Sequence, residues 1–238
     1  MKILALESSA LTASVAICED GRLLALRSQN SGLTHSEMLL PMVESLLGST
    51  KITVKDIDIF ACAIGPGSFT GVRIGVATIK GLAFGQAKTC IGVSTLEALA
   101  YNLKDFDGIL CPVMNARREQ VYNALFSCHE GKLTRLTPDR AISLESLKIE
   151  LATTVAPGQK IYLCGDGYEM TRDALSGLPV YLPSEFLLWQ NACSVVAVAL
   201  ELYDKGVRTT DAELTPVYLR VPQAERERLE KLGLQTNP

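Results

Sequence analysis

The sequence has few histidines and no closely spaced cysteines. Both shortages limit the metal sites and disulfide bonds that the chain can form. Only two histidines occur in 238 residues, His35 and His129, and they lie far apart. The seven cysteines are isolated, form no CxxC pair and are odd in number. Zinc sites and disulfide frameworks depend on clustered residues of these types. We therefore expect no zinc site and interpret the cysteines as small buried residues of a protein in a reducing cytosol.

Long hydrophobic runs, a leader pattern and an excess of positive charge are also missing. No apolar stretch reaches the roughly 20 residues of a membrane-spanning helix. Residues 1–7 begin with a strand-like run and show no signal-peptide pattern. The net charge is −3, so strong unaided binding to nucleic acid is not expected. These absences favour a cytoplasmic protein that contacts no membrane.

The most informative stretch is Gly65–Gly75, which reads GPGSFTGVRIG. It lies between a strand-like run, Ile57–Ile64, and a helix-like run, Thr70–Phe84. A glycine turn that leads into a helix aims backbone N–H groups at one point, which suits an anion or a tightly docked neighbour. Its spacing matches neither a P-loop, nor a GxGxxG fingerprint, nor a nucleophile elbow. Phosphate binding and an ordinary strand–helix turn both remain open from these residues.

The hydrophobic pattern of the first hundred residues predicts an α/β half-domain with the element order βββαβαβα and a mixed sheet. Thr34 and Glu37 are spaced as a capping box at the start of the first helix. The strands are expected at Ile3–Leu6, Thr12–Cys18, Arg22–Arg27, Ile57–Ile64 and Thr89–Val93, and the helices at Thr34–Gly48, Thr70–Phe84 and Thr95–Tyr101.

A polar break at residues 104–108 is the expected junction to a second lobe. We predict a first lobe at residues 1–103, a second at 104–212, and a tail at 213–238 that returns to the first lobe and contains a charged helix, Ala224–Leu234. In the second lobe, strands are expected at Ile109–Met114, Gln120–Ser127 and Ile161–Cys164, and helices at Leu144–Leu151, Glu169–Leu175 and Ala192–Tyr203.

Five motifs occur together and in order: ILALESS, THSEMLLP, GPGSFTGVRIG, NARREQVY and TPVYLRVPQAER. With them the chain resembles, over nearly its whole length, the TsaB (YeaZ) family of bacterial proteins of tRNA threonylcarbamoyladenosine biosynthesis. The resemblance implies an actin-like ATPase (ASKHA, ribonuclease H-like) fold with two lobes of mixed sheets, the second reduced. Glu7 and Asn115 depart from the family, in which aspartate is common at both positions.

The resemblance also implies a division of labour with TsaD, the catalytic relative. TsaD carries a metal-binding His-x-x-x-His where this chain has Thr95 and Leu99. Leucine cannot coordinate a metal, and a threonine hydroxyl is a poor ligand for soft or borderline ions. We expect a non-catalytic scaffold that pairs with TsaD and TsaE, forms a homodimer when alone, reaches tRNA only through the complex and has no metal site. An independent actin-like ATPase or kinase is the alternative, and a metallopeptidase is disfavoured.

Two sets of site residues are predicted. Any ATP or ADP is expected at the interface within the complex rather than as the chain's own cofactor, and the expected phosphate-binding residues are Glu7, Ser8, Ser9, Gly65, Gly67 and Ser68. The expected partner interface, with internal packing as the alternative, is Met38, Leu39, Met42, Val43, Leu46, Gly71, Val72, Gly75 and Ile79. Gly165-Asp166-Gly167 is the one candidate for a second phosphate loop. Two roles remain open for the arginines of the last two motifs, contact with RNA or pairing with acidic side chains: Arg117, Arg118 and Arg220.

Overall fold

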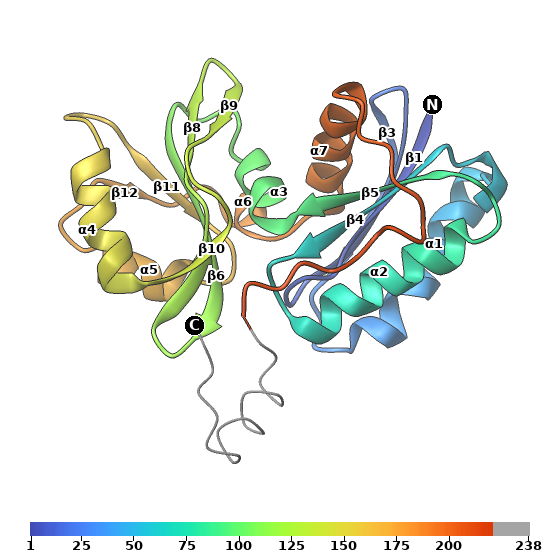
Figure 1. The fold of residues 1–238 in the computed structure, drawn as a ribbon, viewed down its shortest axis with the longest axis horizontal. Coiled ribbons are helices and arrows are strands. Elements are labelled where there is room, and N and C mark those ends of the chain that lie inside the picture. The colour runs from blue at the N-terminus through green and yellow to red at the C-terminus, as the bar shows by residue number, and fades with distance from the viewer. Residues whose placement is uncertain (221–238) are drawn as a thin grey trace, which may run out of the picture.

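Two lobes, each built on a mixed β-sheet, lie side by side (Figure 1). The structure is a computed structural model, and it describes residues 1–220. The predicted charged helix at 224–234 lies outside the described residues. Within residues 1–220, no helix is both long and apolar enough to cross a membrane.

The first sheet has the strand order β3-β2-β1-β4-β5. Its strands are β1 (Lys2–Glu7), β2 (Ala13–Glu19), β3 (Arg22–Gln29), β4 (Ile59–Gly65) and β5 (Thr89–Ser94). β1 pairs antiparallel with β2 and parallel with β4, so the sheet is mixed as predicted. Successive side chains of a strand point to opposite faces, and β1 accordingly sends Leu4 and Leu6 into one core and Ile3 and Ala5 into another.

Four helices cover the two faces of this sheet, and Figure 1 shows α1 and α2 on one side and α7 on the other. They are α1 (His35–Thr50), α2 (Phe69–Ala83), α3 (Thr95–Tyr101) and α7 (Ala192–Asp204); a short 3₁₀ helix, η1 (Val54–Asp56), precedes β4. Thr34 and Glu37 form the predicted capping box of α1, and the Ser68 hydroxyl accepts from the N–H of Gly71 at the start of α2. The predicted order βββαβαβα of the first lobe is confirmed.

The second sheet has the order β10-β7-β6-β11-β12, with β8 pairing beside β6 and β9 beside β8. Its elements are β6 (Gly108–Arg117), β7 (Gln120–Asn123), β8 (Phe126–His129), β9 (Lys132–Arg135), β10 (Arg140–Ser143), β11 (Ile161–Cys164), β12 (Val180–Tyr181), α4 (Leu144–Thr154), α5 (Tyr168–Ala174) and α6 (Glu185–Leu188).

The predicted single strand Gln120–Ser127 is wrong, because the structure has two strands there. β7 pairs with β6 as far as Asn123, and β8 resumes the pairing at Phe126. Between these points β6 contains Pro112, which has no N–H to donate to a ladder. The Asn123 side chain instead donates to the Pro112 carbonyl over 3.0 Å. The strand breaks because its neighbour lacks a donor.

The chain returns to the first lobe at α7. Val195, Val198 and Ala199 of this helix are buried against the first sheet. The helix lies within the expected second lobe, 104–212, yet its apolar face fits the sheet face that α1 and α2 leave open. The return thus begins by Ala192 rather than at residue 213.

Candidate functional site

The glycine turn packs against the turn that follows β1. The N–H of Ser68 donates to the Ser9 carbonyl over 2.6 Å. A Cβ on Gly67 would overlap that same carbonyl, and a Cβ on Gly71 would overlap the carbonyl of Ser8. The Ser8 hydroxyl donates to the carbonyl of Gly71 over 2.9 Å. These glycines allow two backbone segments to touch. The sequence suggested either an anion or a closely packed neighbour at this turn, and the structure has the neighbour.

Glu7 is fully buried at the end of β1. Its Oε1 atom accepts from the N–H of Ser9 over 2.6 Å and from the Ser9 hydroxyl over 2.5 Å. Burial raises the pKa of Glu7 to about 7, against the lowering effect of the hydrogen bonds from Ser9 and Ser8. The Ser9 donors that the sequence suggested for phosphate are therefore already used by a carboxylate of the chain itself.

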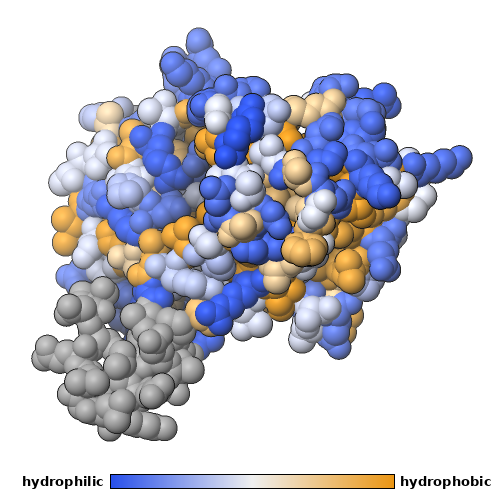
Figure 2. Space-filling model, turned by 45° about the vertical axis from the view of Figure 1, so that its right-hand side comes forward, coloured by the Kyte–Doolittle hydropathy of each residue, from blue (hydrophilic) through white to orange (hydrophobic). Residues whose placement is uncertain are grey.

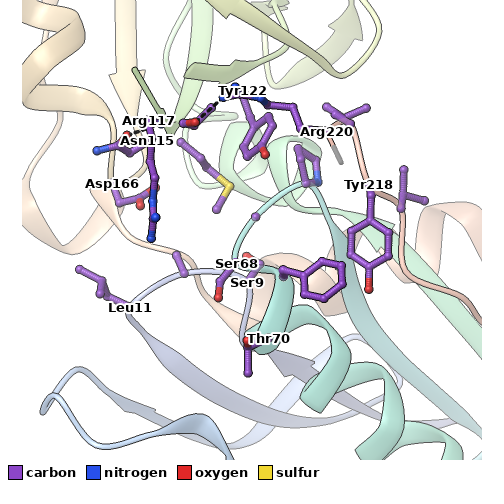
Figure 3. Close-up of a pocket in the computed structure, with 18 residues that line it drawn as sticks. Ser9, Leu11, Ser68, Thr70, Asn115, Arg117, Tyr122, Asp166, Tyr218 and Arg220 are labelled. Atoms are coloured by element: carbon purple, nitrogen blue, oxygen red, sulfur yellow. Dashed lines mark hydrogen bonds between the residues drawn. The ribbon is translucent and has the colours of Figure 1, made fainter. Parts of the chain in front are cut away.

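A cavity of about 580 Å³ opens between the lobes (Figure 3). Ser9, Ser68 and Thr70 reach it from the first lobe, whereas Asn115 and Asp166 reach it from the second. Burial raises the pKa of Asp166 to about 6, although backbone hydrogen bonds oppose the shift. Of the predicted phosphate-binding set, Ser9, Gly67 and Ser68 line this cavity, and Glu7, Ser8 and Gly65 are buried beside it.

Residues 207–220, which we call the strap, run along the first lobe and cross to the second (Figure 1). The N–H of Val217 donates to the Ile64 carbonyl over 2.8 Å. The Tyr218 ring lies 4.7 Å from the Phe69 ring, and its hydroxyl accepts from Arg73 Nε over 2.8 Å. At the far side of the cavity, Arg220 Nη1 donates to the carbonyl of Ala116 over 2.6 Å.

Sequence reasoning did not anticipate the role of the strap. The motif TPVYLRVPQAER was noticed, but its place beside the cavity follows only from long-range contacts. Phe69, Tyr122 and Tyr218 were likewise not expected at a site, although all three line the cavity. The sequence could have indicated them, because each of the three motifs that line the cavity contains one of these aromatic residues.

The residues predicted to form the partner interface face the protein's own core. Met38, Met42 and Val43 of α1 are at most 5 % exposed, and the rest of the set is buried as well: Leu39, Leu46, Gly71, Val72, Gly75 and Ile79. Gly75 approaches Ser8 closely. The expectation that these side chains meet a partner is corrected, because the apolar stripe covers the first sheet.

The outer faces of the same helices remain exposed. On α2 they present Arg73, Ala77 and Gly81, and Phe84, just after the end of α2, is 78 % exposed. On α1 the exposed apolar side chain is Leu40, at 48 %. Figure 2, in which the first lobe comes forward, shows orange hydrophobic patches among polar atoms on this side of the molecule. We call the exposed α2 residues the outer ridge.

The two histidines lie in different places. His35 Nε2 pairs with the Ala10 carbonyl at 2.6 Å, whereas His129 is exposed in the second lobe, 3.3 Å from Asp107. Thr95 and Leu99, the two positions at which the sequence argued against a metal site, are both buried. Gly165 and Gly167 shape the turn between β11 and α5, and Asp166 points from it into the cavity (Figure 3). Within residues 1–220, no three His, Cys, Asp or Glu side chains are grouped to hold a metal.

A family model for TsaD, tRNA N6-adenosine threonylcarbamoyltransferase, matches residues 29–219. A TsaB protein of Bacillus subtilis, described as a tRNA threonylcarbamoyladenosine biosynthesis protein, is 38 % identical over 60 % of this chain and 63 % of its own length. The Escherichia coli protein with the same description is 29 % identical over 92 % of this chain and 95 % of its own.

Solved structures agree with these matches. YeaZ from Pseudomonas aeruginosa superposes with a TM-score of 0.78, at 26 % identity, over 92 % of this chain and 99 % of that one. Component A of (R)-2-hydroxyglutaryl-CoA dehydratase from Acidaminococcus fermentans gives a TM-score of 0.50 at 11 % identity, over 86 % and 98 % of the two chains, a likeness of fold alone. The predicted actin-like fold with two lobes is confirmed.

Proposed function

Because this chain belongs to the TsaB (YeaZ) family of tRNA threonylcarbamoyladenosine biosynthesis proteins, we propose that it is a non-catalytic scaffold. It holds a TsaD-type transferase competent while that enzyme moves threonylcarbamoyl from threonylcarbamoyl-AMP to an adenosine next to the anticodon. TsaE is the third subunit, and tRNA is reached through the complex. The seven free cysteines fit this role in a reducing cytoplasm.

The observation that carries the proposal is the chemistry at the start of α3. Thr95 is 0 % exposed and Leu99 is 1 % exposed, and Leu99 packs in the apolar core of the second lobe. Two histidines one helical turn apart can ligate a single metal ion, but a threonine and a core leucine cannot replace them. The chain matches the TsaD family model over residues 29–219, but the proposed ligand pair is missing from it.

The outer ridge is the proposed docking surface, and its occupant is a TsaD-type subunit. The TsaD model spans both α1 and α2, so the two proteins share a similar helix pair. Ala77 and Gly81 are small, and a Cβ on Gly81 would meet no other atom, which lets a partner helix approach closely. Without TsaD, a second copy takes the same surface and forms the homodimer.

Nucleotide at the cavity is a second candidate, at the boundary with TsaD. The cavity volume and the hydroxyls of Ser68 and Thr70 support it, whereas the engagement of Ser9 by Glu7 opposes phosphate at that turn. ATP turnover by the isolated protein, lost in Glu7→Ala, would instead favour an independent ATPase.

Reconstitution tests the scaffold. Purified TsaD, TsaE, a source of threonylcarbamoyl-AMP and unmodified tRNA are combined with and without this chain, and modified adenosine is measured. We expect modification only when the chain is present with TsaD. Modification at an unchanged rate without the chain, or modification by the chain alone, would overturn the proposal.

A further inference from the structure

A second cavity, of about 540 Å³, lies in the second lobe. It is lined by the start of β6, the end of β8, the residues that lead into β11 and the loop that joins α3 to β6. Within residues 1–220, it shares no lining residue with the cavity between the lobes. β6 begins at this cavity with Gly108 and reaches the other one at Met114, so about 20 Å of strand separates the two. We call this second cavity the distal groove.

The groove exists because the middle strand has a glycine where its neighbours have side chains. Gly108 of β6 pairs with Cys128 of β8 on one side, and a Cβ on Gly108 would lie 3.3 Å from the Tyr162 ring of β11 on the other. The same Cβ would overlap the Lys160 carbonyl, and the φ angle of Gly108 is +150°, so a larger residue would be strained there. The missing side chain leaves a space between Tyr162 and Cys128.

The side of the groove along β11 combines aromatic rings with a positive charge. The Phe106 and Tyr181 rings lie 5.0 Å and 5.9 Å from the Tyr162 ring. Tyr162 is only 9 % exposed, yet its hydroxyl makes no hydrogen bond within residues 1–220. The exposed Lys160 ammonium lies 5.1 Å from the Tyr181 ring and makes no ion pair in the same part of the chain. This side therefore offers flat apolar surface, a free hydroxyl and an unneutralised cation.

The side of the groove along β8 carries the opposite charge. The Asp107 Oδ2 atom lies 3.3 Å from His129 Nδ1, and Oδ1 accepts from the N–H of Glu130 over 2.8 Å. Burial raises the pKa of the Cys128 thiol, and the Asp107 and Asp105 carboxylates add to the rise, so both lie near β8. Asp107 is already paired, whereas Asp105 makes no hydrogen bond or ion pair with the residues that the structure describes. Asp105 is therefore the available acceptor.

The two ends of the groove lie on either side of β6, two strand spacings apart, which is about 10 Å. A ligand that fills it needs a flat ring in the middle, a negative group near Lys160 and a hydrogen-bond donor near Asp105. Adenine and cytosine nucleotides have all three, because their amino group lies at the base edge far from the sugar phosphate; guanine and uracil have a carbonyl there. An aromatic amino acid does not fit, since its ammonium and carboxylate leave the same carbon atom.

We propose that the distal groove binds one adenine or cytosine nucleotide, either free or within a single-stranded stretch of RNA. The base packs against the Phe106 and Tyr162 rings. The phosphate pairs with Lys160, and the amino group donates to the Asp105 carboxylate. Neither the outer ridge nor the cavity between the lobes takes part, so this binding is independent of the scaffold role. With RNA as the source, the chain contacts RNA directly in spite of its net charge of −3.

Nuclear magnetic resonance of the full chain, without partner subunits, tests the proposal. The ¹⁵N-labelled protein is titrated with AMP, CMP, GMP and UMP, and amide shifts are followed at Gly108 and Cys128 in the groove and at Ser68 and Asn115 in the cavity between the lobes. We expect saturable shifts at the groove amides, with AMP and CMP binding at least about fivefold more tightly than GMP and UMP. A single-stranded oligonucleotide of A and C that binds more tightly than AMP identifies RNA as the source, and equal or weaker binding identifies the free nucleotide.

Two variants and a matched control separate the contacts. Lys160→Gln keeps a polar side chain but loses the charge, and it should weaken AMP binding at least about tenfold. Asp105→Asn should bring GMP and UMP to the affinity of AMP, because an amide both donates and accepts. Lys205→Gln changes an exposed lysine at the end of α7 and should bind as the wild type does. Circular dichroism confirms that each variant is folded.

Three results would rule out a nucleotide in the distal groove. The first is the lack of saturable shifts at Gly108 and Cys128 with all four nucleotides. The second is a set of shifts confined to Ser68 and Asn115, which would place the nucleotide between the lobes instead. The third is equal AMP binding by Lys160→Gln and Lys205→Gln.

Discussion

Single residues in the glycine turn act through contact within the chain. The backbone of Ser8 and Ser9 lies so close to the turn and to the start of α2 that a methyl group on Gly67 or Gly71 would collide with it. The sequence showed that close approach was needed, because glycines in a helix are otherwise unfavourable. It could not show what approached, since a phosphate and a carbonyl demand the same space.

Two glycines of α2 provide a matched pair for this argument. Gly71→Ala places a Cβ on the Ser8 carbonyl, and we expect a loss of about 1–3 kcal/mol in the free energy of unfolding. Gly81→Ala meets no atom within 4 Å and should stabilise the protein by up to about 1 kcal/mol through helix propensity. Urea unfolding measures both changes. Equal stabilisation by the two substitutions would show that the turn is loosely packed.

At the scale of elements, the sequence predicted that α1 and α2 are helices, but it could not predict which surface their apolar faces cover. Apolar residues at helical spacing predict a buried face, and both helices form. The same stripe serves equally well against the protein's own sheet or against another chain. Met38, Met42 and Val43 were therefore assigned to a partner, although they cover the first sheet. A charge at Val43 or Gly75 would unfold the protein rather than test an interface.

The outer ridge gives the proper test of docking. Ala77→Glu adds a charge at an exposed helical position, so the melting temperature of the isolated chain should stay nearly unchanged. Association with TsaD, measured by calorimetry, should be lost because a buried unpaired charge opposes docking. Ile149→Glu, at a 62 % exposed apolar position of α4, is the control and should leave association intact. Equal binding by both variants would contradict the assignment of the surface.

The strap is the second element with a separable role. Tyr218→Ala removes the contact with Phe69 and the hydrogen bond from Arg73. We expect it to cost about 1–2 kcal/mol, from the aromatic contact and the lost hydrogen bond. Amide hydrogen exchange should accelerate at Val217, whose N–H donates a hydrogen bond to the Ile64 carbonyl. Tyr181→Ala, at a 46 % exposed tyrosine of β12, should leave that amide protected, and acceleration in both variants would argue against a local effect.

At the scale of the whole molecule, the sequence predicted the parts better than their assembly. The first lobe follows from local periodicity and capping, so its order of elements was predicted. The break between β7 and β8 depends on Pro112 in a neighbouring strand, and the cavity collects residues as distant as Ser9 and Arg220. Such features arise from pairing between segments remote in the chain, which no local pattern encodes.

A charged network joins the two lobes through α3 and β9. Arg135 of β9 contacts Glu97 of α3 at 2.6 Å and Asp139 at 2.6 Å. The Ser94 hydroxyl donates to the same Asp139 over 2.6 Å. The Arg135 and Glu97 side chains are 31 % and 28 % exposed, so solvent screens the pair only in part. Networks of this kind contribute more than isolated surface pairs.

A double-mutant cycle measures whether this network holds the lobes together. Arg135→Gln and Glu97→Gln should each destabilise the protein, and the two losses should not add, because either change already breaks the same ion pair. We expect a coupling energy of about 1 kcal/mol from urea unfolding, decreasing at high salt as screening grows. Arg172→Gln, which removes an exposed pair with Asp173, supplies the comparison and should change stability by less than about 0.5 kcal/mol. Losses that add to within about 0.3–0.5 kcal/mol would mean that the lobes are held by α3 packing and the strap, without help from these charges.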